Sequence, residues 1–448
     1  MSETCKVLVR RVAGFEECGA PMQDAETCEL GHRLGSGPIA DFKRKVVAGE
    51  KLPPVERLHQ GPPEYKLFSV DDHIIEPADV WSKRVPAKYR DTAPHVVEED
   101  GREYWVYEQT RALTMGLNAV AGKPRDEWTM DPARFSDMIP GCYDPVQRAK
   151  DMAADGVMST VLFPSLPRFG GALFPSFKDL ELAAVCVKAW NDFLVEEWCA
   201  AAPAMFVPMP IVPLWDPKAA AAEIRRNAAR GARAVNLPEE TSLLGLPSYH
   251  SDSWDPVWDA ITECDLPVCM HIGSSGWSPF QPADAPFSVT MALGCVGAMC
   301  HAISLMMSPV PRRFPTIKFV ISEGGIGWVP PMLERADRQY PRHRYWAGGD
   351  DVLPSEVCRR NFYWCLIEEP WGIQMRYELG VDHVMWECDY PHTDTPWPNS
   401  QLAAKAMFDP LPREEVDLIT HRNAEKLFKW QCPDPDGYRG VPAAAGAS

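Results

Sequence analysis

Short apolar runs alternate with longer amphipathic stretches between residue 65 and about residue 430. The apolar runs are seven to nine residues long, the length of a strand that is buried on both faces. They predict eight strands, at 66–74, 157–164, 205–213, 232–238, 266–273, 317–325, 361–367 and 383–391.

Helical signals lie between these strands. Residues 216–231 begin with Asp-Pro, continue through an Ala-rich body and end at a glycine, which predicts a helix before the fourth strand. Residues 254–265 predict a helix before the fifth strand, and residues 424–430 predict one after the eighth. Strands that alternate with helices indicate parallel βαβ units.

Two α/β architectures fit this alternation. An open doubly wound sheet is one, but the chain contains neither GxGxxG nor GxxxxGK[ST], so no dinucleotide or phosphate turn is marked. Eight units in about 370 residues favour the other, a closed (β/α)8 TIM barrel.

The domain boundaries follow from the same pattern. Residues 1–62 hold few long apolar runs and predict an N-terminal extension, with the barrel at 63–431. Residues 90–150 are long for one crossover, so we expect an insertion or lid there. Residues 432–448 end in PAAAGAS and predict a disordered C-terminal tail.

Charge and composition restrict the partners. The chain has 45 basic and 62 acidic side chains, a formal charge of −17, which argues against nucleic acid and anionic membranes. No run approaches 18 uninterrupted apolar residues, and the N-terminus lacks the apolar core of a secretory signal. Most of the 14 cysteines lie in apolar runs, as expected of reduced cysteines in a cytoplasmic protein.

Proline and tryptophan gather in the long segments between apolar runs. The chain has 44 prolines and 16 tryptophans, with clusters at 164–177 and 392–400. Rigid, aromatic-rich loops on a regular scaffold are typical of an enclosed small-molecule pocket.

The active site of a barrel lies at the carboxyl ends of its strands, where this sequence places several metal-binding residue types. Alternation puts two side chains of the first strand, Asp71 and His73, on one face. His271 ends the fifth strand, Glu323 the sixth and Asp389 the eighth.

Each residue alone also fits a structural role. A single histidine at a strand end is commonly a hydrogen-bonded scaffold residue, and Asp389 could cap the turn that follows it. Their shared position at one end of the barrel favours a metal site instead. Two imidazoles and two carboxylates suit Zn²⁺, Mn²⁺ or Fe²⁺ and leave room for a water or a substrate oxygen.

Four segments carry a family resemblance: SVDDHIIEP, MHIGSSG, KFVISEGGIGWVPPMLERAD and WECDYPHTDTPWPNS. They resemble the amidohydrolase-related family of the amidohydrolase superfamily, in the branch of aminocarboxymuconate-semialdehyde decarboxylase and γ-resorcylate decarboxylase. The resemblance spans about residues 65–430 and implies a distorted barrel with one divalent metal, zinc first among the candidates. It implies Asp71, His73, His271 and Asp389 as the ligands.

The chain departs from that family's pattern at two positions. Asp71 stands where the decarboxylases tend to have His or Glu, which leaves a carboxylate able to bind metal. Glu323 stands where characterised decarboxylases have a catalytic histidine. A glutamate can transfer protons if burial raises its pKa, but it supplies no imidazolium charge. The fourth strand carries Arg233 and no lysine, so we expect one metal and not a carboxylated-lysine pair.

The N-terminal extension contains a second, weaker candidate site. Cys5, Cys18, Cys28 and His32 resemble a degenerate zinc ribbon, although the CxxC pairs of a strong zinc signal are missing. They predict a structural zinc or, alternatively, a thiol-bearing arm that packs on a neighbouring subunit. From the family habit we expect a homodimer to which residues 1–62 contribute.

Three functions remain open on the sequence alone. The leading one is hydrolysis of a small, cyclic, carbonyl- or carboxylate-bearing substrate by metal-activated water, with Asp389 accepting a proton and Glu323 donating one. The alternative is metal-dependent, non-oxidative decarboxylation of an aromatic or unsaturated carboxylate, with Asp389 or Glu323 as the acid. A further alternative is a non-catalytic barrel scaffold, which should hold no stoichiometric metal.

Overall fold

The computed structural model describes most of the chain from residue 55 onward. The described residues are 55–434 without Gln60, Leu113, Pro132, Phe280 and Ala283, and the backbone of the paired antiparallel strands β1 (Leu8–Arg11) and β2 (Gly14–Glu17). The rest of the predicted extension and residues 435–448 of the predicted tail lie outside them.

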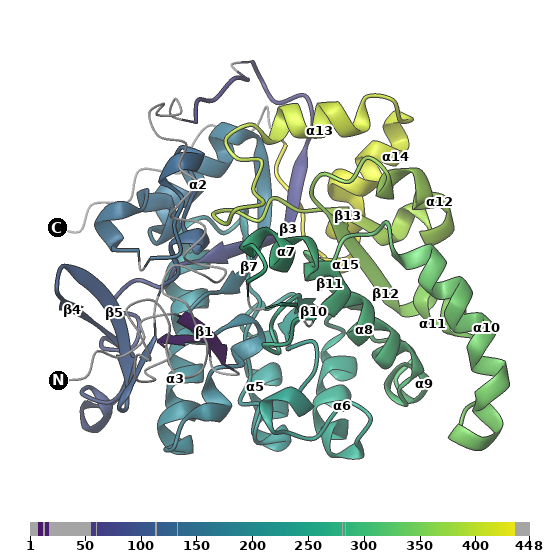
Figure 1. Ribbon diagram of the computed structural model, residues 1–448, viewed down its shortest axis with the longest axis horizontal. Helices are drawn as coiled ribbons and strands as arrows, with labels where there is room; N and C mark the ends of the chain where they lie inside the picture. Colours follow the sequence, from purple (N-terminus) through teal and green to yellow (C-terminus); the bar gives the residue numbers. More distant parts are fainter. Residues whose placement is uncertain are drawn as a thin grey trace.

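Eight short parallel strands form the centre of the molecule (Figure 1). They form two hydrogen-bonded arcs, in the orders β3-β7-β8 and β9-β10-β11-β12-β13. Their bounds are β3 (Leu67–Ile74), β7 (Val157–Pro164), β8 (Phe206–Val207), β9 (Val235–Asn236), β10 (Val268–His271), β11 (Phe319–Ser322), β12 (Phe362–Leu366) and β13 (Val384–Trp386).

Backbone hydrogen bonds join the two arcs at both seams. Between β8 and β9, the N–H of Asn236 donates to the carbonyl of Pro210 at 3.0 Å. Between β13 and β3, the N–H of Asp389 donates to the carbonyl of Asp71 at 2.8 Å. The sheet therefore closes on itself, which confirms the predicted (β/α)8 barrel.

Proline shortens one of the predicted strands. Only Phe206 and Val207 of the predicted strand 205–213 are in the ladder, because Pro208, Pro210 and Pro213 have no N–H to donate. The carbonyls of Pro208 and Pro210 still accept bonds from the next strand, so the barrel wall continues through this segment.

Helices cover the outside of the strands (Figure 1). The predicted helix at 216–231 is α5, in which the Asp216 carboxylate accepts the N–H groups of Lys218 and Ala219 at 3.0 Å and Pro217 occupies the first turn. The main helices are α2 (Pro145–Asp155), α3 (Leu180–Phe193), α5 (Pro217–Ala228), α6 (Asp255–Cys264), α8 (Gly294–Met307), α10 (Val329–Ala347), α11 (Pro354–Asn361), α13 (Ser400–Phe408) and α15 (Asn423–Phe428).

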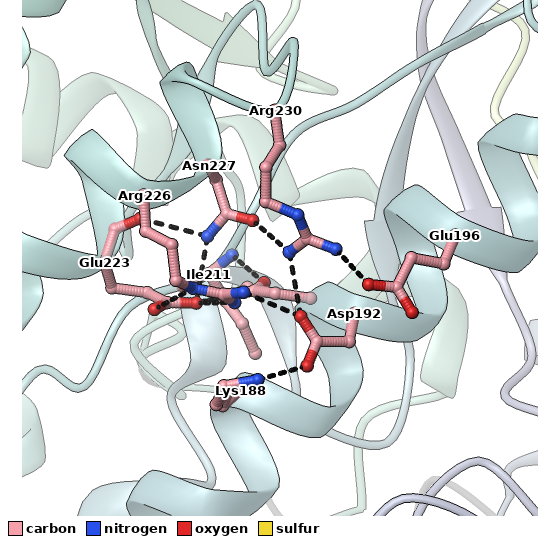
Figure 2. A network of polar contacts seen from close by, with 9 residues as sticks. Lys188, Asp192, Glu196, Ile211, Glu223, Arg226, Asn227 and Arg230 are labelled. Carbon is pink, nitrogen blue, oxygen red and sulfur yellow. Dashed lines mark hydrogen bonds and ion pairs between the residues drawn. The ribbon is translucent and has the colours of Figure 1, made fainter.

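A network of ion pairs fastens α3 to α5 (Figure 2). Asp192 of α3 lies 2.7 Å from the guanidinium of Arg226 in α5 and 2.8 Å from that of Arg230 just beyond α5. Arg230 also reaches Glu196, one turn after α3. Because α3 precedes β8 and α5 follows it, these contacts hold two adjacent βα units in register.

An insertion occupies the region where the sequence predicts one. It begins with an antiparallel sheet of β4 (His95–Glu99), β5 (Arg102–Tyr107) and β6 (Thr110–Ala112) and continues through short 3-10 turns to α2. Leu117, Val120 and Met130 of the insertion form an apolar cluster against which Phe287 packs. The insertion thus contacts α7 (Phe287–Ala292).

One stretch of the described chain, Phe287–Met307, is long and apolar enough to cross a membrane, and 28% of its apolar 18-residue window is buried. It comprises α7 and α8. Ala298, Ala302 and Leu305 of α8 lie in the main core, as expected of a barrel helix. The remaining face is apolar and partly exposed, a feature that bears on assembly.

Candidate metal centre

The carboxyl ends of four strands meet at one mouth of the barrel. Asp71 and His73 come from β3, and His271 is the last residue of β10. Glu323 directly follows β11, and Asp389 lies three residues after β13. The structure therefore brings together all five residues that the sequence predicts for the site.

These side chains lie at metal-ligand spacing. The Nε2 atom of His73 is 3.3 Å from Asp71 Oδ1 and 3.1 Å from Asp389 Oδ1. The Nε2 atom of His271 is 3.2 Å from both Asp71 Oδ2 and Glu323 Oε2. Within each of three overlapping triads, the candidate ligand atoms lie within 4.8 Å of one another.

The site is buried, and its carboxyl groups repel one another. Burial, reinforced by neighbouring carboxylates, raises the pKa of Asp71 and of Asp389 well above their ordinary values. Burial lowers the pKa of His73 and of His271, so both imidazoles are neutral, the form that binds metal. A cation among these groups would offset the repulsion.

Several polar atoms of the site have no hydrogen-bond partner in the described part of the chain. They include both carboxylate oxygens of Asp71 and of Asp389, and the Nε2 atoms of His73 and His271. Buried polar atoms are almost always paired, so these orphaned atoms fit a bound cation. Imidazole nitrogen with carboxylate oxygen suits a divalent ion such as Zn²⁺, Mn²⁺ or Fe²⁺.

His271 is held in the tautomer that a metal requires. Its Nδ1 atom lies 2.7 Å from the carbonyl oxygen of Ile272. Since a carbonyl can only accept, Nδ1 carries the proton, and the lone pair of Nε2 points into the site.

The neighbouring Asp72 has a structural role on the other face of β3, as alternation predicts. Its carboxylate accepts the hydroxyl of Thr160 on β7 and, at 2.8 Å, the N–H of Tyr390 after β13. Burial raises the pKa of Asp72 to about 6. Asp72 therefore joins the first strand to both of its neighbours and leaves Asp71 and His73 to the site.

Glu323 lies closer to the ligands than the sequence leads us to expect. The sequence analysis gives Glu323 a catalytic role and does not count it among the four metal ligands, whereas its Oε2 atom is as near to His271 as the Asp71 carboxylate is. Its backbone is left-handed, with φ 53°, and its N–H donates to the buried carboxylate of Glu387 at 3.1 Å. Burial raises the pKa of Glu323 to about 8.

His392 is a site residue that the sequence reasoning missed. Its ring stacks on His73 with centroids 3.6 Å apart, and its Nδ1 atom lies 3.0 Å from Asp389 Oδ1. Its Nε2 atom has no partner among the described residues. The available signal was its position three residues after Asp389 in DYPH, beyond the end of the strand where alternation applies.

A cavity of about 390 Å³ opens onto this cluster. Phe169, from the loop 164–177, covers the His271 ring at a centroid distance of 3.9 Å. Trp277 and Phe287 form part of another wall, and Met130 of the insertion lines the cavity as well. The loops in which the sequence predicts pocket walls thus contribute to them.

The second candidate site cannot be placed in the same way. Cys5, Cys18, Cys28 and His32 lie outside the described residues. A structural zinc on these side chains stays a prediction of the sequence.

Comparisons with known proteins fit this arrangement. The amidohydrolase family profile matches residues 91–430. Gamma-resorcylate decarboxylase of Rhodococcus jostii is 28% identical over 352 residues, which cover 72% of this chain and 97% of that protein. Decarboxylase orsB of Emericella nidulans is 26% identical over 275 residues, 55% of this chain and 77% of that protein.

A solved structure shares the fold. Amidohydrolase map2389c of Mycobacterium avium subsp. paratuberculosis superposes with a TM-score of 0.63 at 22% identity. The match covers 82% of this chain and 99% of that one.

We predict that His271→Ala weakens metal binding by more than about 100-fold, because it removes a directly coordinating nitrogen. Metal content after dialysis, measured by plasma mass spectrometry, should fall, while circular dichroism stays that of the folded protein. The exposed His250, whose ring nitrogen lies 3.0 Å from the Ser304 hydroxyl, provides the control His250→Ala, which should keep normal metal content. Stoichiometric, tightly held metal in folded His271→Ala would refute the assignment.

Proposed function

Because the chain belongs to the amidohydrolase family, we propose that it is a metal-dependent, non-oxidative decarboxylase of a small aromatic carboxylate. The observation that carries the proposal is the match to gamma-resorcylate decarboxylase along 97% of that protein. Our sequence-based preference for hydrolysis has less support than this alternative. The scaffold alternative has less support as well, since the curated relatives named above are decarboxylases.

The cavity supports an aromatic substrate. Its volume of about 390 Å³ lies near the lower end for small-molecule sites. Phe169, Trp277 and Phe287 provide flat apolar surfaces, and Met115 and Met130 add flexible ones that adapt to ring substituents. An apolar wall of this kind suits a substituted benzene ring.

In this proposal Asp71, His73, His271 and Asp389 hold one divalent metal. When bound, the metal would supply positive charge to the substrate carboxylate and to the oxygen of an adjacent hydroxyl group on the ring. The residues of the chain would orient the ring, exclude water and deliver a proton. Zinc remains our first candidate, with manganese and iron equally compatible with the donors.

Glu323 is the proposed proton donor. Burial raises the pKa of Glu323 to about 8, which favours the protonated carboxyl group at pH 7. A nearby cation would lower this pKa toward 7. That is the range in which a general acid works best at neutral pH. The proton would pass to the ring carbon that bears the carboxylate. Cleavage of the bond to CO₂ then returns its electron pair to the ring and restores aromaticity.

We expect the protein, loaded with Zn²⁺ or Mn²⁺, to release CO₂ from 2,6-dihydroxybenzoate. In D₂O the product should carry one deuterium at the carbon that lost CO₂, which mass spectrometry detects. Metal-free protein is the control. Hydrolysis of aryl esters or lactones without CO₂ release from any hydroxybenzoate would favour the hydrolase instead.

For Glu323→Gln we expect turnover to fall by roughly 10²–10⁴ with metal content unchanged, the usual size of a general acid–base contribution. If Glu323 instead supports the ligands, the variant should lose metal affinity by about 10–100-fold. Glu334→Gln, on the exposed face of α10, is the matched control. Normal turnover together with normal metal content would rule out both roles.

We also propose that the protein forms a homodimer. Val296, Met299, Cys300, Ile303 and Met307 recur at helical spacing on α8, and all are partly or fully exposed. Such a stripe is typical of a surface that another protein covers. The net charge of −17 makes a second apolar face a better partner than an anionic membrane.

Sedimentation should therefore show a dimer at micromolar concentration, and Met299→Glu should shift it toward monomer by placing a charge in the stripe. Glu334→Gln again serves as the surface control. A monomeric wild-type protein would contradict the proposal.

A further inference from the structure

We propose that Asp394 and Glu369 determine specificity, so that the cavity accepts an aromatic ring with one acid group and a hydrogen-bond-donating substituent, hydroxyl or amino, and rejects a second anionic group. This inference rests on the proposed function. It concerns the ring substituents that do not bind the metal.

The described side chains that line the cavity include acidic groups but no lysine or arginine. Three carboxyl groups line it, those of Glu323, Glu369 and Asp394. The imidazoles on the wall, His271 and His392, belong to the candidate metal centre or stack on it. The wall therefore offers no cation to a second anionic group.

Glu369 is a fixed acceptor. Its carboxylate receives the N–H groups of Ile326 at 3.0 Å and Gly327 at 3.1 Å. A Cβ atom at Gly325 would lie 2.3 Å from one carboxylate oxygen, and one at Gly372 would lie 2.4 Å from the other. These two glycines let the backbone approach the carboxylate closely, and its two N–H bonds hold it at the cavity wall.

The carboxylate of Asp394 is available to accept a hydrogen bond from a ligand. Asp394 is an exposed residue of the loop after β13, five residues beyond Asp389, and it lines the cavity. No other described residue gives its carboxylate a hydrogen bond or an ion pair. A carboxylate that lacks a protein partner can take a hydrogen bond from a hydroxyl or amino group of a bound ligand.

The two acids act differently on the two kinds of ligand. The metal, when bound, would balance one substrate carboxylate. A second carboxylate in the cavity would meet the acidic side chains of Glu369 and the exposed Asp394 without a lysine or arginine among the described lining residues, so it would be repelled. A hydroxyl or amino group in the same place would donate to them. Selectivity should therefore appear in binding itself, before any chemistry.

The test is calorimetric binding of paired probes to the Mn²⁺-loaded protein. 3- and 4-Hydroxybenzoate are compared with the benzenedicarboxylates substituted at the same positions, so that only the second group differs. We expect the better hydroxybenzoate to bind at least about 10-fold more tightly than its dicarboxylate partner, a difference that one like-charge contact at about 4 Å can supply even where solvent partly screens it. Asp394→Asn should reduce this ratio, and Asp394→Lys should reverse it.

Asp284→Asn, an exposed change in the segment before α7, should leave the ratio unchanged, and thermal melting confirms that each variant is folded. Equal or tighter binding of the dicarboxylates by the wild-type protein would overturn the inference, as would an unchanged ratio in folded Asp394→Lys. If that occurs while 2,6-dihydroxybenzoate is still decarboxylated, only the inference falls. If no benzoate binds to the loaded protein, the proposed function falls with it.

Discussion

Repulsion among buried carboxyl groups is the constraint on which this site depends. Asp71, Glu323, Glu387 and Asp389 crowd into one end of the barrel, and burial raises the pKa of each. Nearby imidazoles are neutral and cannot balance that charge. Either the carboxyl groups hold protons, or a cation sits among them. The orphaned oxygens of Asp71 and Asp389 favour the cation, which makes metal binding part of what stabilises this end of the barrel.

The contacts that close the barrel also bring the residues of the site together. The hydrogen bond that joins β13 to β3 runs from Asp389 to Asp71, two of the proposed ligands. Asp389 and Glu323 both have left-handed backbones, with φ 56° and 53°, a conformation that costs energy in residues other than glycine. The ladder on either side and the contact of Glu323 with Glu387 hold them there. In this backbone conformation the carboxylate of Asp389 reaches His73 and that of Glu323 reaches His271.

The sequence predicts the barrel and the five central residues because both follow from local periodicity. Apolar runs set the strands, and alternation separates Asp71 and His73 from Asp72 on the opposite face. His392 and Glu387 could not be found in this way. The ring of His392 stacks on His73, and Glu387 accepts the N–H of Glu323, contacts between strands that only the closed barrel creates. The short β8 was foreseeable, since its prolines stand in the sequence.

The choice between hydrolysis and decarboxylation turned on the glutamate at the end of the sixth strand. From the sequence, Glu323 in place of a histidine removes an imidazole from the reaction and weakens the decarboxylase interpretation. The structure shows that the cavity nevertheless has an additional imidazole, because His392 lies on its wall, in contact with Asp389 and stacked on His73. An imidazole therefore still faces the cavity, although Glu323 stands at the end of the sixth strand. Burial lowers the pKa of His392 well below its ordinary value, so this imidazole is neutral and supplies no imidazolium charge. The proposed decarboxylation therefore depends on Glu323 for its proton and on the bound metal for positive charge.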